Sequence, residues 1–265
     1  MVKNDYIPFA SEILKVIKHT PEEYTFRMAY QGGEVKPGQF FEVSIPKYGE
    51  APISVCGIGD GYVELTIRKV GKVTGEVFEH YVGQSLFLRG PYGNGFDLDN
   101  YKGKELIIVA GGTAVSPVRE VISYFANHPD ERKNMTLIAG FKSESEILFR
   151  ADLADWRKKM DLILTLDAGE ETEEHKIGLV TKYIPDVAVE DLDSAVAIVV
   201  GAPMMMKFSI KALLERGFRE ENIWISQARK MCCGLGKCGH CKCGETYICQ
   251  DGPVFNYTEG KHLMD

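Results

Sequence analysis

Hydrophobic and polar residues alternate one by one in several short runs up to about Asp97, and glycine, proline and asparagine separate these runs. A period of two is typical of strands that bury one face, and short strands at this spacing predict a small antiparallel β-barrel. One helix is predicted inside it, at 74–81, where Thr74 can act as the N-cap and Val77, Phe78 and Tyr81 share a face. The predicted strands are 12–18, 24–30, 39–45, 62–69 and 85–89.

The pattern changes after Lys104 to short, wholly apolar runs that alternate with amphipathic segments. Continuous apolar strands separated by helices are typical of a parallel sheet that is covered on both faces. This part is therefore predicted to be a doubly wound α/β domain. Its expected strands are 106–110, 135–141, 162–166 and 196–200, and its expected helices are 115–126, 149–158 and 204–216.

Regular patterning ends near Ser226, where a segment rich in cysteine and glycine begins. This segment is too small to bury a core of its own, so it needs a metal centre to be ordered. The sequence thus predicts three parts: an antiparallel β-barrel at 1–100, a parallel-sheet α/β domain at 101–226 and a small cysteine lobe at 227–265.

Composition and charge narrow the possible functions. The chain has 265 residues, 45% of them hydrophobic and 26% charged, as in a soluble protein with more than one core. Its formal net charge of −7 leaves no basic excess for the phosphates of a nucleic acid. No apolar run reaches the roughly 20 residues of a membrane span, and the first residues lack the apolar region of a signal peptide. We therefore expect a cytoplasmic protein with no nucleic-acid partner and no membrane span.

Of the seven cysteines, only Cys56 lies outside the stretch from Cys232 to Cys249. Disulfides therefore cannot cross-link the bulk of the fold, and the odd number indicates a reducing compartment and metal chemistry. Four of the clustered cysteines follow the spacing C-x4-C-x2-C with a further cysteine after seven residues, which is typical of a plant-type [2Fe-2S] centre. The predicted ligands are Cys233, Cys238, Cys241 and Cys249.

Other residues of the lobe suit such a centre. The glycines at 234, 236 and 239 allow positive φ, so the loop can wrap a compact cluster and direct backbone N–H groups toward its sulfurs. Positive side chains nearby would stabilise the added electron; they are Arg229, Lys230, Lys237 and Lys242.

A structural zinc site is the alternative, because Cys238-x-x-Cys241 could serve as a zinc knuckle beside His240. Zinc modules with four ligands usually have two separated knuckles, whereas this segment has one. Cys232 and Cys243 have no predicted role, although Cys232 could replace Cys233 if the loop shifts by one residue.

Four motifs resemble the ferredoxin–NADP reductase superfamily in the right order along the whole chain. They are Ala-Pro-Ile-Ser at 51–54, Gly-Gly-Thr-Ala-Val-Ser-Pro at 111–117, Gly-Ala-Pro-Met at 201–204 and the cysteine lobe. The segment 249–255 is similar to the branch that holds the electron-transfer subunit of dihydroorotate dehydrogenase and the gamma subunit of sulfhydrogenases. Within that branch, the segments 49–55, 70–74, 92–95, 236–241 and 255–257 resemble the B subunits of anaerobic sulfite reductases.

The resemblance implies that the barrel binds FAD, with Ser54 as the catalytic partner of flavin N5. The superfamily binds the pyrophosphate with an arginine where this chain has Ala51, and Arg68 and Lys69 are the expected substitutes. Without the resemblance, the Gly-x-x-Thr sequence that ends at Thr74 would be only a capped turn, and the turn at 90–93 is either a last flavin contact or a plain turn. The implied FAD contacts are Pro52, Ile53, Ser54, Ile67, Lys69, Gly71, Val73 and Thr74.

The resemblance also implies a nicotinamide nucleotide site in the α/β domain. The glycines at 111 and 112 lie between a buried strand and a helix, where parallel sheets bind dinucleotide phosphates, although Ala114 replaces the last glycine of the superfamily motif. Lys142 could meet a 2′-phosphate, but no arginine accompanies it, and the sequence favours NADH over NADPH. The turn at 201–204 could instead only pack the core, and Asp167 could be a solvated turn residue. The implied contacts are Gly111, Gly112, Thr113, Pro117, Asp167, Gly201, Pro203 and Met204.

These features together predict an electron-transfer subunit. NAD(P)H would give a hydride to flavin N5 near Ser54, and the FAD would pass the electrons singly to the [2Fe-2S] cluster. The implied partners are an iron–sulfur acceptor subunit and a catalytic subunit that reduces sulfite to sulfide at a sirohaem. Alternatives are the electron-transfer subunit of dihydroorotate dehydrogenase or of a hydrogenase and, from another class, a non-catalytic assembly module with a zinc-stapled lobe.

Overall fold

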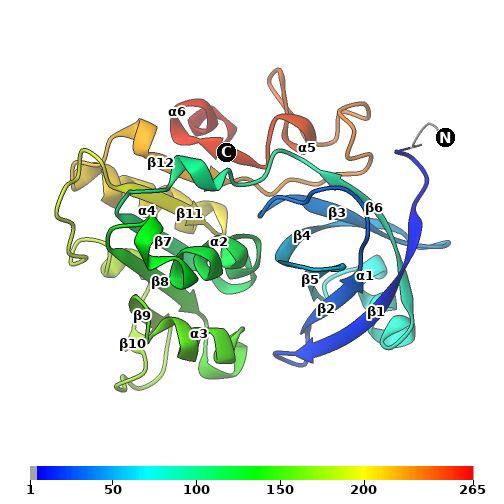
Figure 1. The fold of residues 1–265 in the computed structure, drawn as a ribbon, viewed down its shortest axis with the longest axis horizontal. Coiled ribbons are helices and arrows are strands. Elements are labelled where there is room, and N and C mark those ends of the chain that lie inside the picture. Colours follow the sequence, from blue (N-terminus) through cyan, green and yellow to red (C-terminus); the bar gives the residue numbers. More distant parts are fainter. Residues whose placement is uncertain (1–4, 265) are drawn as a thin grey trace. The chain divides into compact units, whose positions relative to one another are not determined.

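The computed structural model describes residues 5–264, and the chain forms two compact units (Figure 1). The first unit joins the residues up to Phe96 with Ala228–Pro253, and the second joins Asp97–Gln227 with the residues from Val254 on. The cysteine segment therefore forms one unit with the barrel, whereas the sequence predicted a separate lobe at 227–265. The chain after Val254 belongs to the α/β unit because it adds a strand to that sheet.

Six antiparallel strands close the predicted barrel, in the order β1-β2-β5-β4-β3-β6. Its core consists of fully buried apolar side chains from alternate positions, such as Phe26, Phe41, Leu65 and Leu88. The alternation in the sequence is thus the alternation of core and outer faces, and the predicted barrel is confirmed. The strands are β1 (Phe9–Lys18), β2 (Glu23–Ala29), β3 (Phe40–Ile45), β4 (Gly49–Gly59), β5 (Tyr62–Arg68) and β6 (Ser85–Tyr92).

The helical segment of the barrel begins earlier than the sequence predicted. It consists of α1 (Lys72–Glu76) and a following turn of π-helix, η1 (Val77–Tyr81). The α1 helix packs against β3 and β4, and Val73 lies next to Gly49. Residues 71–74 therefore lie beside the first half of β4.

A seven-stranded sheet forms the centre of the second unit, in the order β10-β9-β8-β7-β11-β12-β15. All neighbours are parallel except β15, which runs antiparallel to β12. The strands are β7 (Leu106–Gly111), β8 (Met135–Phe141), β9 (Asp161–Leu166), β10 (Lys176–Ile177), β11 (Val196–Val200), β12 (Ile223–Ser226) and β15 (Val254–Asn256).

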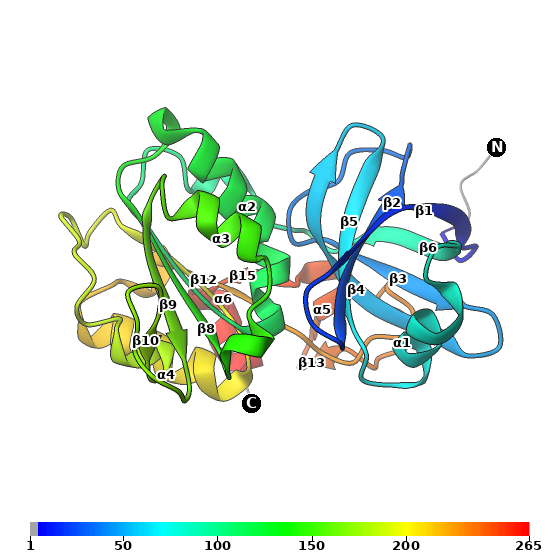
Figure 2. The same cartoon turned by 90° about the horizontal axis from the view of Figure 1, so that it is seen from below.

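Helices cover both faces of this sheet, as the apolar strands predicted. Figure 2 shows α2 and α3 on one side and α4 on the other, which confirms the doubly wound α/β arrangement. No helix in residues 5–264 is long and apolar enough to cross a membrane. The helices are α2 (Val115–Asn127), α3 (Arg150–Trp156), α4 (Pro203–Glu215) and α6 (Tyr257–Gly260), with the short turns η2 (Leu98–Asn100), η3 (Gly112–Ala114), η4 (Pro129–Glu131), η5 (Glu144–Glu146), η6 (Val180–Lys182), η7 (Glu220–Asn222) and η8 (Lys261–Leu263).

The strand order creates a switch point between β7 and β11. From β7 the chain continues outward through β8, β9 and β10, and then returns to the other side of β7 as β11. Ligands of open α/β sheets bind at the carboxyl ends of the strands at such a point. Gly111 and Gly201 lie there, at the ends of these two neighbouring strands.

The cysteine segment contains little regular structure: β13 (Lys242–Cys243), β14 (Thr246–Tyr247) and α5 (Ile248–Asp251). It is joined to the barrel just after β6, where the backbone N–H of Asn94 donates to the Gly252 carbonyl at 2.7 Å. The Asn94 side chain donates to the Asp251 carbonyl at 3.0 Å. A Cβ on Gly93 would lie 2.6 Å from Pro253, so the two backbones approach closely.

Candidate functional site

The first half of β4 carries the Ala-Pro-Ile-Ser motif and is open along one edge. Residues 49–54 pair with β3, whereas pairing with β5 begins only at Val55. Each residue from Glu50 to Ser54 is half-buried, although the strand lies within a closed barrel. The predicted flavin residues Pro52, Ile53 and Ser54 therefore lie on a strand segment that a planar cofactor can reach.

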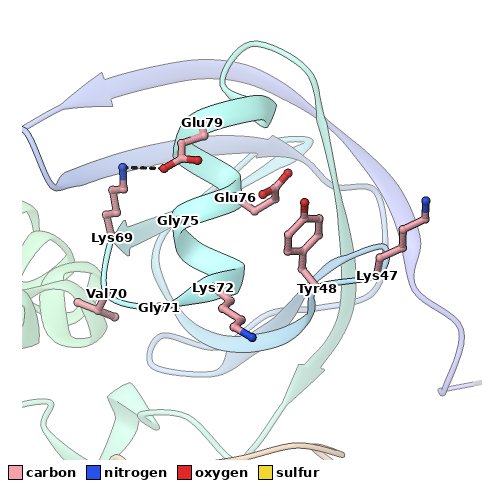
Figure 3. Close-up of a pocket in the computed structure, with 9 residues that line it drawn as sticks. All are labelled: Lys47, Tyr48, Lys69, Val70, Gly71, Lys72, Gly75, Glu76 and Glu79. Carbon is pink, nitrogen blue, oxygen red and sulfur yellow. Dashed lines mark hydrogen bonds and ion pairs between the residues drawn. The ribbon is translucent and has the colours of Figure 1, made fainter.

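A hollow of about 790 Å³ lies around the start of α1 (Figure 3). Glu79 pairs with Lys69 at 3.1 Å and Glu76 pairs with His80 at 2.8 Å. Tyr48 points toward Glu76 in Figure 3, and the nearby Glu76 carboxylate raises the pKa of the Tyr48 hydroxyl. The hollow is lined by Lys47, Tyr48, Lys69, Val70, Gly71, Lys72, Gly75, Glu76 and Glu79.

The backbone at the start of α1 is both capped and accessible. The Thr74 hydroxyl accepts from the backbone N–H groups of Val70 and Gly71, both at 3.0 Å. The N-cap of α1 is Gly71, and Thr74 is the third residue of the helix, so the prediction of Thr74 as the N-cap was wrong. A Cβ added to Gly71 or Gly75 would meet no atom within 4 Å. The glycines therefore leave open space at the wall of the hollow, which suits a bulky anion such as a diphosphate.

Three residues predicted to contact the flavin, Ile67, Arg68 and Lys69, have other contacts in the structure. The Ile67 side chain is fully buried in the barrel core, so only its backbone can reach a ligand. Both expected substitutes for the missing arginine already lie beside carboxylates, Arg68 at 3.7 Å from Glu23 and Lys69 at 3.1 Å from Glu79. Lys72, which the sequence did not single out, is exposed at the hollow and has no carboxylate partner among the described residues. Its position directly after the glycine of the Gly-x-x-Thr sequence was the available signal.

The switch point of the α/β unit contains the predicted nucleotide glycines. Gly112 has a φ of +58° and open space around the position of a Cβ. Gly111 and Gly201 are both covered by Met205, whose Sδ would lie 2.6 and 2.5 Å from an added Cβ. The sequence assigned the pocket contact to Met204, but the Met204 side chain is 59% exposed and its neighbour Met205 lies over the two glycines. Helical periodicity could not distinguish these adjacent methionines.

The other predicted nucleotide residues lie around the same edge of the sheet. Thr113 is in the η3 turn and Pro117 is half-buried in the first turn of α2. Pro203 opens α4 directly after β11. Asp167 is exposed at the end of β9, where its backbone N–H donates to the Phe141 carbonyl at 3.0 Å.

The four predicted cluster cysteines form two pairs. The Cys238 side chain contributes to the lowered pKa of the Cys233 thiol, and the Cys241 side chain contributes to the raised pKa of the Cys249 thiol, so the members of each pair lie close together. Within residues 5–264, no three His, Cys, Asp or Glu side chains are grouped closely enough to hold one metal ion. Two pairs match a binuclear cluster, in which each of two irons takes two cysteine ligands.

Backbone N–H groups point at the sulfurs of this loop. Leu235, Lys237 and Cys238 each donate to Cys233 Sγ at 3.4 Å, and Gly236 donates to Cys249 Sγ at 3.2 Å. Burial alone would raise the pKa of the Cys233 thiol, but these donors and the Cys238 thiol lower it to about 6. Burial and the Cys241 thiol raise the pKa of Cys249 to about 12. The loop thus has the donors that stabilise cluster sulfurs, so its residues fit an iron–sulfur centre.

The loop conformation depends on its glycines, as the sequence predicted. Gly234, Gly236 and Gly239 have φ values of +69°, +65° and +78°. Of the two cysteines without a predicted role, Cys232 is exposed and Cys243 accepts a hydrogen bond from Arg229 at 3.4 Å.

Three features define the class of protein: the open strand segment of β4, the glycines at the switch point and the cysteine loop. The chain is a ferredoxin–NADP reductase-like protein with an added iron–sulfur site. Residues 108–211 match the model of the oxidoreductase NAD-binding domain, and residues 228–260 match the iron–sulfur cluster binding domain of dihydroorotate dehydrogenase B.

Among relatives, the chain is 35% identical to the sulfhydrogenase 1 subunit gamma of Pyrococcus furiosus, over 96% of this chain and 92% of that protein. It is 31% identical to the probable dihydroorotate dehydrogenase B (NAD(+)) electron transfer subunit of the same organism, over 88% and 83%. The chain therefore belongs to the family of electron-transfer subunits that contains these two proteins. The expected class, an NAD-dependent flavin and iron–sulfur oxidoreductase subunit, is confirmed, and FAD, NADH and an iron–sulfur cluster are the cofactors that go with it.

Solved structures show the same fold. The NADH-dependent reduced ferredoxin–NADP oxidoreductase studied for flavin-based electron bifurcation has a TM-score of 0.78 and 22% identity, over 98% of this chain and 91% of that chain. A ferredoxin–NADP⁺ reductase from Neisseria gonorrhoeae with bound FAD and NADP has a TM-score of 0.70 and 17% identity, over 82% and 97%.

We predict that Cys249→Ser abolishes the visible absorption of the cluster, because a serine oxygen replaces one of the four sulfur ligands. Iron content and the absorption spectrum of protein purified without air measure the effect. Cys243→Ser is the matched control, since Cys243 lies in the same loop outside the two pairs, and it should retain iron. Equal loss of iron in both variants would contradict the ligand set.

We also predict that Gly112→Ala weakens NADH binding. An alanine at a φ of +58° costs about 1–2 kcal/mol, so the turn after β7 would change its conformation. Gly103→Ala is the matched control, because Gly103 has a φ of +67° and equally open surroundings in a turn away from the switch point. Titration of both variants with NADH should show weaker binding for Gly112→Ala alone; unchanged affinity there would exclude this glycine from the site.

Proposed function

We propose that the chain oxidises NADH or NADPH through FAD and a [2Fe-2S] cluster and supplies the electrons to a partner iron–sulfur subunit. The observation that carries this proposal is the packing of the cysteine loop on the barrel within one compact unit. Both the β4 segment that suits a flavin and the two cysteine pairs belong to this unit. An electron leaving the flavin site would therefore have an acceptor site in the same compact unit.

Each group of residues has its own task. Ser54 would be the partner of flavin N5. The Gly71 backbone and the Lys72 amine would hold the diphosphate, because Ala51 stands where the superfamily has an arginine. The Gly111 and Gly112 turn admits the nucleotide phosphates, and the four cysteines hold the cluster. When bound, FAD supplies the step between the two-electron chemistry of the nucleotide and the one-electron chemistry of the cluster.

The partner that the similarities favour is a hydrogenase of the sulfhydrogenase type, with dihydroorotate dehydrogenase as the second candidate. Both partners are alternatives that the sequence offered beside a sulfite reductase. The sulfite reductase and its sirohaem subunit have only short motifs in their favour, at 49–55, 70–74, 92–95, 236–241 and 255–257, and the relatives do not support them.

The absorption spectrum of the full chain purified without air tests the proposed function. We expect flavin bands and a ferredoxin-like envelope, both of which bleach on addition of NADH or NADPH. A colourless protein that contains zinc would instead establish the non-catalytic assembly module. Co-purification from the native cell distinguishes the partners, since a hydrogenase, a dihydroorotate dehydrogenase and a sirohaem sulfite reductase subunit each have their own activity.

Lys72→Glu should weaken FAD binding by about fivefold, the size of effect usual for an exposed charge contact. Flavin fluorescence during titration of the deflavinated protein with FAD measures the change. Lys15→Glu, on β1 and exposed, makes the same charge change away from the hollow and should bind FAD as the unaltered protein does. A Lys72 variant that retains full affinity would remove this lysine from the diphosphate site.

A further inference from the structure

Arg89 is a charged residue of β6 that the expected chemistry leaves without a role. It is only 4% exposed, and burial of a guanidinium is unfavourable unless all its donors are paired. All of its five N–H groups have an acceptor in the structure. Its partners lie on three separate segments: β4, β6 and the cysteine loop.

The first partner is Glu50, on the flavin strand. Arg89 Nε donates to one carboxylate oxygen of Glu50 at 3.1 Å, and Nη2 donates to the other at 2.6 Å. A two-point contact of this kind fixes both position and orientation of the guanidinium. Glu50 directly precedes Ala51, so the pair is attached to the start of the motif that suits FAD.

The second partner is the cysteine loop. Arg89 Nη1 donates to the carbonyl oxygen of Cys233 at 2.5 Å, and Nη2 donates to that of Cys232 at 3.4 Å. Cys233 is a predicted cluster ligand and the residue on which three backbone N–H groups converge. The guanidinium therefore holds the backbone of a ligand residue directly.

Tyr92 completes the arrangement. Its hydroxyl accepts from Arg89 Nη1 at 2.8 Å and donates to the Asp5 carbonyl at 2.7 Å. The Tyr92 ring also packs on Gly234, where an added Cβ would lie 2.7 Å from the ring. The turn at 90–93, which the sequence left as a flavin contact or a plain turn, forms with its neighbours Arg89 and Asn94 the surface on which the cysteine loop rests.

We propose that Arg89 is a positioning residue for the cluster, which joins the flavin strand at Glu50 to the ligand loop at Cys233 and so fixes the spacing of the two cofactors. This inference rests on the proposed function. Residues that hold a metal ligand from behind commonly change metal affinity or activity by about 10- to 100-fold when they are replaced. Electron transfer between the cofactors depends on the same geometry.

The test uses three variants of the full chain, each purified without air. Arg89→Gln removes the positive charge and the bidentate contact with Glu50. Arg89→Lys keeps the charge, but a lysine cannot contact Glu50 at two points and Cys233 at the same time. Arg27→Lys is the matched control: Arg27 binds Glu64 at 2.8 Å in the same barrel, on β2 and β5, away from the cysteine loop. Glu50→Gln serves as a milder variant if Arg89→Gln does not fold.

Three quantities are measured: iron per FAD, the electron paramagnetic resonance spectrum of the dithionite-reduced cluster, and the rate of cluster reduction after mixing with NADH. We expect both Arg89 variants to keep FAD, to show an altered or heterogeneous cluster spectrum, and to reduce the cluster at least about tenfold more slowly. Arg89→Lys should be less affected than Arg89→Gln, while Arg27→Lys should match the unaltered protein.

An unchanged spectrum and rate in Arg89→Gln would overturn the positioning role while leaving the proposed function intact. An equal change of spectrum and rate in Arg27→Lys would overturn the positioning role too, because weakening any ion pair of the barrel would then change the cluster in the same way. If the unaltered protein itself contains no flavin or is not reduced by NADH, the proposed function fails first and the positioning role fails with it.

Discussion

The cysteine loop depends on support from the barrel, because a short segment rich in glycine has no apolar side chains to spare for a core. The support is polar as well as apolar. A buried arginine binds the backbone of the loop, a tyrosine ring packs on Gly234, and the glycine at 93 lets two backbones approach. Burial of the guanidinium cation is unfavourable by itself, and the bidentate contact with Glu50 neutralises its charge. The position of the predicted cluster is thus set by the same strands that border the flavin site.

Much of the fold could be predicted from the sequence, because its elements bury faces in regular order. The strands β8 and β11 are wholly buried and were predicted at their observed bounds. The alternation did not reveal the strand β4, although that strand contains the predicted flavin residues Pro52, Ile53 and Ser54. Gly49, Pro52, Gly57 and Gly59 interrupt its alternation, and its first half leaves one edge to a ligand instead of to β5. A strand built to accommodate a cofactor does not display the pattern of a strand built to pack.

The residues of the candidate sites also differ in whether the sequence could predict them. The cysteine ligands and the glycines at 111 and 112 could be predicted from the sequence because the chemistry expected of them depends on local spacing. Contacts between distant segments could not be found in this way. Arg89 and Cys233 are far apart in sequence, and the choice between Met204 and Met205 depends on the rotation of α4 by one residue. The polar side chains that hold a site in place belong to this second group, since any exposed or buried arginine looks alike in a sequence.

The antiparallel pairing of β15 with β12 fixes both ends of the cysteine loop. The chain leaves the sheet at Ser226 and rejoins it at Val254 on the neighbouring strand, so the loop is an insertion into a β-hairpin. A loop tethered at both ends loses little freedom when it folds, and its length can vary at small entropic cost. The sheet therefore holds both ends of this loop, at Ser226 and at Val254. The same topology allows the loop to be replaced by a loop of another length without a change in the sheet, since the sheet is complete on either side of it.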